Sequence, residues 1–171
     1  MSETIHLIAT GGTIDSVFNP PTERKIMRHE SGLEDFLNKA IRPKDTITYE
    51  TPFMIDGHDM TDSYRERILN SINNTSCKKI LLSHGTDNMT VTAEYLSEHL
   101  KQTDKTIIMF GAMLPLDGFY HSDAPFNMGY ALAEVKSHPA GIYICMNGHT
   151  FNPGEVKKNT AIGEFEHKEA S

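Results

Sequence analysis

Short runs of β-branched and other apolar residues recur along the chain and predict β-strands. The five runs are Thr4–Ala9, Thr46–Glu50, Lys79–Ser83, Thr106–Gly111 and Gly141–Met146. Between them, apolar residues recur at the three- and four-residue spacing of amphipathic helices. This spacing is found in Leu33, Phe36, Leu37 and Ile41, then in Tyr64, Ile68, Leu69 and Ile72. Two further helices are predicted after Asp87 and after Pro125, so strands and helices alternate throughout.

This alternation predicts an α/β fold with a mainly parallel, doubly wound sheet of about five strands and helices on both faces. Because crossover connections between parallel strands are right-handed, few other folds are compatible with this order of strands and helices. Residues 1–171 are expected to form a single domain, because this length suffices for one hydrophobic core. Ligands of such sheets bind beyond the carboxyl ends of the strands, so the residues that follow each strand are the candidates for a site.

Two segments between the first two strands carry local signals of their own. Ser31 followed by Glu34 has the S-x-x-E spacing of a capping box and predicts the start of a helix there. The segment from Ser16 to His29 contains Pro20 and Pro21 and shows no periodicity, which predicts a long loop that is a lid or is disordered.

Composition excludes several classes of partner. The formal net charge is −7, from 16 Lys and Arg against 23 Asp and Glu, with no basic cluster for nucleic acid or an anionic membrane. The chain begins without a basic segment followed by an apolar one and contains no apolar run long enough to span a membrane. Cys77 and Cys145 lie in or beside apolar runs, which favours reduced core thiols and a cytoplasmic location.

The first strand leads into Thr10-Gly-Gly-Thr13, where two glycines allow a sharp turn that leaves the Thr13 hydroxyl at the edge of the sheet. By itself this turn is equally typical of a phosphate-binding or purely structural turn, although the third glycine of a dinucleotide-binding motif is missing. The third strand ends in Ser83-His-Gly-Thr-Asp87, which brings a hydroxyl and a carboxylate to the start of a helix. Taken alone, Thr86 and Asp87 are better explained as residues that cap the helix. His58 could equally be a surface or core histidine.

Taken together, these segments resemble the bacterial-type L-asparaginase family. The resemblance rests on five motifs in family order: Ala9-Thr-Gly-Gly-Thr-Ile14, Gly57-His-Asp-Met60, His84-Gly-Thr-Asp87, Gly111-Ala-Met113 with Pro115, and Pro125-Phe-Asn127. It extends from Ile5 to about Lys158.

The resemblance implies that Thr13 is the nucleophile and Thr86 a second catalytic hydroxyl, supported by Lys158 or, as the alternative, Lys157. It implies that Asp87, adjacent to this lysine, is also a catalytic residue and doubles as the partner of the substrate α-ammonium group. Gly57 and His58 would hold the α-amino and α-carboxylate groups. Gly12 and Ala112 are further candidates for substrate contact, with no metal or cofactor.

Amide hydrolysis requires this set of groups, because a threonine hydroxyl must lose its proton to attack and the departing ammonia must gain one. The resemblance thus predicts an L-asparaginase that acts by a double displacement. The alternatives are a glutaminase-asparaginase, an amidase domain of a tRNA amidotransferase, or a non-catalytic aspartate-binding module. We expect a homodimer or a higher homo-oligomer, since two-fold dimers are the commonest soluble assembly.

This sequence departs from the family pattern in three respects. Residues 16–29 contain no tyrosine, where the family usually has one that contacts the nucleophile. Gly57 and His58 stand where family members usually have serine and glutamine. The chain ends where longer members continue into a second, smaller domain. These differences predict weaker substrate binding rather than a different reaction.

Overall fold

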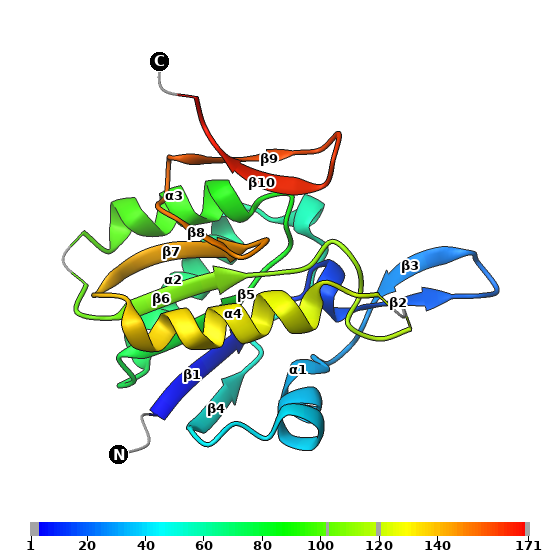
Figure 1. Cartoon of the computed structure of the whole chain (residues 1–171), viewed down its shortest axis with the longest axis horizontal. Coiled ribbons are helices and arrows are strands. Elements are labelled where there is room, and N and C mark those ends of the chain that lie inside the picture. Colours follow the sequence, from blue (N-terminus) through cyan, green and yellow to red (C-terminus); the bar gives the residue numbers. More distant parts are fainter. Residues whose placement is uncertain (1–3, 102, 119–120, 170–171) are drawn as a thin grey trace.

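The computed structural model describes residues 4–101, 103–118 and 121–169, and its centre is a six-stranded sheet (Figure 1). The strand order is β4-β1-β5-β6-β7-β8. The strands are β1 (Thr4–Ala9), β4 (Thr46–Glu50), β5 (Lys79–Ser83), β6 (Thr106–Phe110), β7 (Gly141–Met146) and β8 (His149–Phe151). All neighbours pair in parallel except β7 and β8, which are antiparallel. The mainly parallel sheet and its five predicted strands are confirmed, and β8 is an addition at one edge.

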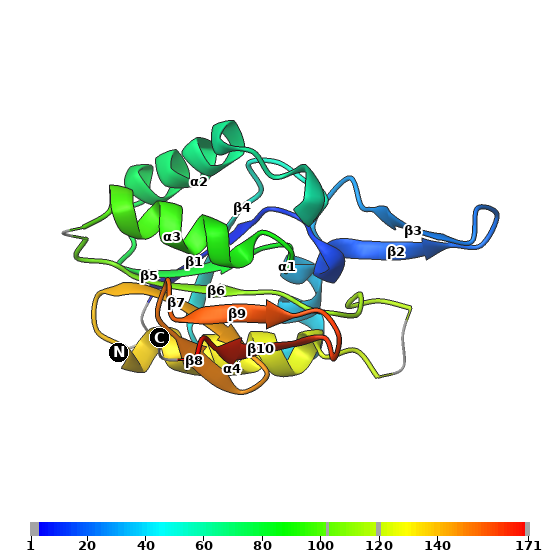
Figure 2. The same ribbon diagram turned by 90° about the horizontal axis from the view of Figure 1, so that it is seen from above.

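Helices cover both faces of the sheet, as predicted (Figure 2). One face carries α2 (Asp62–Asn74) and α3 (Met89–His99). The other carries α4 (Ala124–Ser137) and α1 (Leu33–Phe36), which continues as a π-helical turn over Leu37–Ile41. Two 3-10 turns, η1 (Thr13–Asp15) and η3 (Gly57–Asp59), lie in the loops that follow β1 and β4.

The core consists of two apolar clusters, one on each side of the sheet. Successive side chains of a strand point to opposite faces, so Ile8 joins α2 and α3 whereas its neighbour Leu7 joins α1 and α4. The middle strand β6 is buried along its whole length, which explains its uninterrupted apolar sequence. Because both clusters share one sheet, the described residues form a single domain.

The strand order produces a topological switch point, the place of the ligand crevice in doubly wound sheets, at the carboxyl ends of β1 and β5. From β1 the chain passes to β4 on one side of it and then returns to β5 on the other, so the loops after β1 and β5 leave the sheet in opposite directions. Ligands bind at such a switch point in doubly wound sheets. The Thr10 hydroxyl ties the two strand ends together by donating to the Ser83 carbonyl at 2.8 Å.

The loop predicted for residues 16–29 is wrong, because this segment forms a β-hairpin. Strands β2 (Ser16–Asn19) and β3 (Arg24–Met27) pair antiparallel and project from the carboxyl edge of the sheet (Figure 1). Neither face of the hairpin is packed on the core, so its sequence lacks the apolar alternation that announces a half-buried strand.

The capping box at Ser31 is also not formed as predicted. The helix begins at Leu33, but Gly32 is its N-cap residue and carries no capping side chain. The Ser31 hydroxyl instead donates to the buried Asp15 carboxylate at 2.8 Å and accepts from the Leu33 N–H at 3.2 Å. A tertiary partner has replaced the local pairing with Glu34.

A second hairpin, which no apolar pattern in the sequence predicts, consists of β9 (Val156–Asn159) and β10 (Glu164–His167). Its buried residues Val156 and Phe165 join the apolar cluster that includes α3. The two cysteines are free thiols, and Cys145 is buried as predicted, whereas Cys77 is only half-buried in the turn before β5. No described helix is long and apolar enough to cross a membrane.

Candidate active site

Three glycines bring three loops into direct contact at the crevice. A Cβ atom at Gly12 would lie 2.4 Å from the Cα of Gly85, and a Cβ atom at Gly85 would lie 2.6 Å from the Cα of Gly57. These distances are too short for any side chain, so the loops after β1, β4 and β5 touch backbone to backbone. The residues next to each glycine are therefore held within reach of one another.

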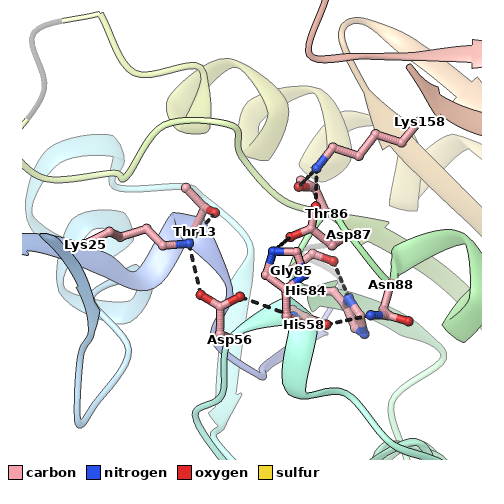
Figure 3. Close-up of polar contacts among 11 residues, drawn as sticks. Thr13, Lys25, Asp56, His58, His84, Gly85, Thr86, Asp87, Asn88 and Lys158 are labelled. Atoms are coloured by element: carbon pink, nitrogen blue, oxygen red, sulfur yellow. Dashed lines mark hydrogen bonds and ion pairs between the residues drawn. The ribbon is translucent and has the colours of Figure 1, made fainter. Parts of the chain in front are cut away.

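On one side of the crevice, Lys158 contacts both polar residues that follow β5 (Figure 3). Its Nζ atom donates to Thr86 Oγ1 at 2.8 Å and to Asp87 Oδ1 at 2.5 Å. Thr86 is buried, and the Lys158 side chain is only 18% exposed. Neither Thr86 nor Asp87 caps α3, whose N-cap residue is Asn88. The structure thus places Thr86, Asp87 and Lys158 in one hydrogen-bonded set.

The register of the β9–β10 hairpin decides between the two candidate lysines. Lys157 lies opposite Glu166 and forms an ion pair with it at 3.2 Å. Lys158 lies opposite the buried Phe165 and therefore points inward, toward the crevice. Of the two, the structure brings Lys158 to Thr86.

On the other side of the crevice, the Thr13 hydroxyl accepts a hydrogen bond from Lys25 Nζ at 3.1 Å (Figure 3). The same ammonium group forms an ion pair with Asp56 Oδ2 at 3.0 Å. Burial raises the pKa of the Asp56 carboxyl, but the hydrogen bonds from Lys25 and from the His58 N–H, together with the positive charge of Lys25, outweigh it, so the pKa lies below its usual value. Asp56 is therefore ionised at neutral pH. Sequence reasoning missed both Lys25 and Asp56.

His58 links the two sides. Its backbone N–H donates to Asp56 Oδ1 at 3.2 Å, and its Nε2 lies 3.2 Å from Asp87 Oδ2. Asp56, His58 and Asp87 offer potential metal-ligand atoms within 4.8 Å of one another. A cation would have to displace the lysines that already hold both carboxylates, so the three residues are better explained as ion pairs than as a metal site.

Three predicted contact residues, Gly12, Gly57 and Ala112, have contacts with the protein itself. The Gly12 N–H donates to the Ile55 carbonyl at 2.9 Å and is not free for substrate, so Gly12 serves instead as the point of close approach. The Gly57 carbonyl accepts the Asn88 side-chain amide at 2.7 Å. Ala112 is buried in the cluster below the sheet, so its side chain does not reach the crevice.

The loop after β6 closes the crevice beside Thr13. The Asp123 carboxylate accepts the N–H groups of Met113 and Leu114 at 2.9 Å. Asn127 Nδ2 donates to the Gly111 carbonyl at 3.0 Å and to the Asp123 carboxylate at the same distance. These bonds explain the presence of Gly111 and Asn127 in the motifs, since both residues shape the wall of the site together with Asp123, which lies outside the motifs.

A hollow of about 260 Å³ opens at Thr13. Its lining residues are Thr13, Phe18, Lys25, Met113, Leu114 and Pro115. A larger hollow of about 410 Å³ is lined by Leu100, Lys101 and Gly141 among others, at the opposite edge of the sheet and away from the polar set described above. Of these two hollows, the smaller one is lined by residues of the polar set, Thr13 and Lys25.

His84 is a buried residue in the loop after β5, two positions before Thr86. Its Nδ1 donates to the Gly85 carbonyl at 2.7 Å, while its Nε2 is buried without a partner among the described residues. Complete burial lowers the pKa of His84 to about 4, so the ring is neutral at physiological pH.

A doubly wound α/β protein with two threonine hydroxyls, each bonded to a lysine ammonium at the switch point, belongs to a class that includes acyl-transfer hydrolases. Residues 4–166 match the family model "Asparaginase, N-terminal". The chain belongs to the asparaginase family.

Among its relatives is L-asparaginase 2 of Escherichia coli, which is 32% identical over 162 residues that cover 90% of this chain and 46% of the relative. A glutamyl-tRNA(Gln) amidotransferase polypeptide of Thermococcus kodakarensis is 29% identical over 86% of this chain and 34% of its own length. The structure of L-asparaginase I from Vibrio cholerae covers the whole chain with a TM-score of 0.85 at 23% identity, and 53% of that protein is covered. The chain therefore spans about half the length, or less, of the curated relatives it matches.

Proposed function

We propose that the protein hydrolyses the side-chain amide of L-asparagine to L-aspartate and ammonia, with Thr13 as the nucleophile. One observation carries the proposal: Thr13 and Thr86 lie at the ends of adjacent strands on one edge of the sheet, and each accepts a hydrogen bond from a lysine ammonium. Membership of the asparaginase family supports it, as does the name of the 32%-identical relative.

The reaction would proceed in two stages. The Thr13 oxygen attacks the amide carbon and forms an acyl-enzyme, and ammonia leaves with a proton supplied from Lys158 through the Thr86 hydroxyl. Water then attacks the acyl group, and its proton returns to Lys158 along the same path. The 2.8 Å bond between Lys158 and Thr86 supports this role, because proton transfer requires such contact.

The substrate α-ammonium group would bind to Asp87, whose second carboxylate oxygen lies at the crevice beside His58. His58 is the exposed partner of that oxygen, with 77% of its side chain accessible, so the substrate ammonium would displace it. The α-carboxylate would then lie near the imidazole that has been released. In this role His58 adapts to the substrate rather than reacting with it.

The decisive experiment is an ammonia-release assay of the purified protein with L-asparagine, run beside the Thr13→Ala variant. We expect turnover by the native protein and a loss of at least about 1,000-fold in the variant, since acyl transfer without its nucleophile retains only residual catalysis. Thr10→Ala is the matched control: it removes from the same turn a buried hydroxyl whose partner, among the residues that the structure describes, is the Ser83 carbonyl. Activity in Thr13→Ala comparable to that of Thr10→Ala would disprove the assignment.

A second candidate substrate is suggested by other relatives, which include a glutaminase-asparaginase of Acinetobacter glutaminasificans that is 28% identical over half of its length. The same assay with L-glutamine separates the two amino acids. We propose asparagine as the better substrate by kcat/KM, and a glutamine efficiency equal to or above that of asparagine would reverse the assignment. The absence of ammonia from both substrates would favour a binding module.

A further inference from the structure

Lys25 is the cation in contact with the hydroxyl that we propose as nucleophile, and nothing in the sequence motifs points to it. It belongs to β3 of the projecting hairpin, opposite Phe18, and both side chains line the hollow at Thr13. Among the described side chains, the hydrogen-bond partner of Thr13 Oγ1 is Lys25 Nζ. The same nitrogen lies 3.0 Å from Asp56.

The hairpin holds Lys25 through its base. Asp15, the last residue of the η1 turn that begins at Thr13, accepts the Ser31 hydroxyl and the Gly32 N–H through its buried carboxylate, both at 2.8 Å. Its backbone carbonyl accepts the Arg28 N–H at 3.0 Å, just after β3 ends. The start of β2 and the end of β3 are thus fixed to the same short turn, and the hairpin register then sets Lys25 beside Thr13.

We propose that Lys25 is a catalytic residue that transfers the Thr13 proton to Asp56. The inference rests on the proposed function, because it takes Thr13 as the nucleophile. The ammonium group of Lys25 passes one proton to the Asp56 carboxylate, and the resulting amine accepts the hydroxyl proton as Thr13 Oγ1 bonds to the carbonyl carbon. Lys25 remains an ammonium group, Asp56 becomes neutral, and the carbonyl oxygen carries the negative charge.

The reverse transfers complete the cycle. When water has attacked the acyl group and the bond to Thr13 Oγ1 breaks, Asp56 returns its proton through Lys25 to the leaving oxygen. The Thr86 side supplies the proton to ammonia and recovers it from water, so the two lysines serve different steps. Each returns to its starting protonation state, and no further reactant is needed.

A lysine is suited to this transfer in a way that an arginine is not. Its ammonium group can lose a proton to a neighbouring carboxylate, whereas the guanidinium group remains protonated in proteins. Asp56 is ionised and its Oδ2 lies 3.0 Å from Lys25 Nζ, so the geometry allows a direct transfer, and the lowered pKa of Asp56 means that the proton is held only briefly before it is returned. The transfer covers two contacts of about hydrogen-bond length, with no residue in between.

The test compares Lys25→Met, Lys25→Arg and Asp56→Asn with the native protein. Arg24→Gln is the matched control, because it removes one positive charge from the adjacent position of β3, where the side chain points to the opposite face. Asn at position 56 keeps the side-chain oxygen that accepts the His58 N–H but cannot hold the transferred proton. Thermal unfolding of each variant checks that the fold is retained.

Two readouts are measured. The first is kcat and KM for asparagine, and the second is the burst of p-nitrophenolate from p-nitrophenyl acetate, with intact mass to detect acylated Thr13. The activated ester reports on nucleophile activation without requiring recognition of the amino acid, so it decides the role of Lys25 even if asparagine is not the substrate. Thr13→Ala provides the baseline for both.

We expect Lys25→Met and Asp56→Asn to lower kcat and the acylation rate by about 100- to 10,000-fold with little change in KM, as for loss of a general base. Lys25→Arg stays within about tenfold of Lys25→Met, and Arg24→Gln behaves as the native protein. If Lys25→Met retains the native acylation rate while Thr13→Ala is inert, the relay is wrong and the nucleophile assignment stands. Restoration of the rate by Lys25→Arg would show that charge alone suffices and would also overturn the relay.

Discussion

The two sides of the crevice contain the same three residue types but differ in how firmly they are held. Thr13, Lys25 and Asp56 form the hairpin-side set, and Thr86, Lys158 and Asp87 form the core-side set. In the core-side set the lysine is 18% exposed and its bonds measure 2.8 and 2.5 Å. In the hairpin-side set the lysine is 38% exposed and its contacts measure 3.1 and 3.0 Å.

The difference follows from what supports each lysine. The β9–β10 hairpin buries Val156 and Phe165 in the apolar cluster beside α3, which fixes the position of Lys158. The β2–β3 hairpin leaves Phe18 49% and Ile26 43% exposed and is fixed mainly at its base. Segments with few buried apolar contacts open at low free-energy cost, so we expect substrate to enter as the β2–β3 hairpin opens.

The largest expected effect tests whether Lys158 and Lys25 act in different chemical steps. Lys158→Met should lower kcat for asparagine by about 1,000-fold, within the range for loss of an acid–base group. The loss should shrink markedly with aspartate β-hydroxamate, whose hydroxylamine leaving group needs less protonation than ammonia. The loss caused by Lys25→Met should stay nearly constant between the two substrates. Steady-state kinetics of both variants on both substrates provide the check, and equal dependence on the leaving group would show that the lysines share one step.

The next effect compares the support of the two hairpins. Phe165→Ala removes a ring that is 4% exposed and should lower the free energy of unfolding by about 3 kcal/mol. Phe18→Ala, on the projecting hairpin, should cost less than about 1 kcal/mol, because half of its ring is already in water. Urea denaturation of the two variants measures both values. Similar losses would mean that the β2–β3 hairpin is held more firmly than its exposure indicates.

Gly85→Ala tests the contact that keeps the two sets together. The added Cβ would lie 2.6 Å from the Cα of Gly57, so the loops must move apart, at a cost of about 2 kcal/mol in stability. Gly129→Ala is the control, since nothing lies within 4 Å of a Cβ at this helical position. We expect kcat to fall in Gly85→Ala alone, as the hydroxyls separate. Native kcat in that variant would show that the spacing of the sets does not limit the reaction.

The smallest effect concerns His84, which precedes Gly85 and Thr86 in the loop of the core-side set. The folded-state pKa of about 4 is below the ordinary value of 6.5, so the unfolded chain binds the proton first as pH falls. The stabilisation is complete above pH 6.5 and is lost progressively as pH falls toward 4. Between pH 7.5 and 5.5 this histidine should lower the free energy of unfolding by about 1 kcal/mol. His84→Asn should remove that part of the slope in urea titrations, and an unchanged slope would mean that other groups produce it.

The strands and the position of the site could largely be predicted from the sequence. The central strands bury both faces, so their apolar runs stand out, and the glycine turns after β1 and β5 mark where the chain leaves the sheet. The projecting hairpin could not be predicted, because it packs neither face on the core and therefore carries no apolar period. A helix does begin at Leu33, close to the start predicted from Ser31, but the capping box with Glu34 does not form: the Ser31 hydroxyl accepts from the Leu33 N–H and donates to Asp15, a partner that the local pattern does not include.

The sequence by itself determined the family, the order of the strands and helices, and the two threonines at the edge of the sheet. Each of these depends on patterns among neighbouring residues, which are visible along the chain without the fold. Only the tertiary structure decided which cations reach those threonines. The inward side of β9 selects Lys158 over Lys157, and the register of a hairpin selects Lys25 over its neighbour Arg24. Side chains alternate along a strand, so a shift of one residue would exchange both choices. That register is set by contacts between distant segments, at Asp15 for one hairpin and at Phe165 for the other.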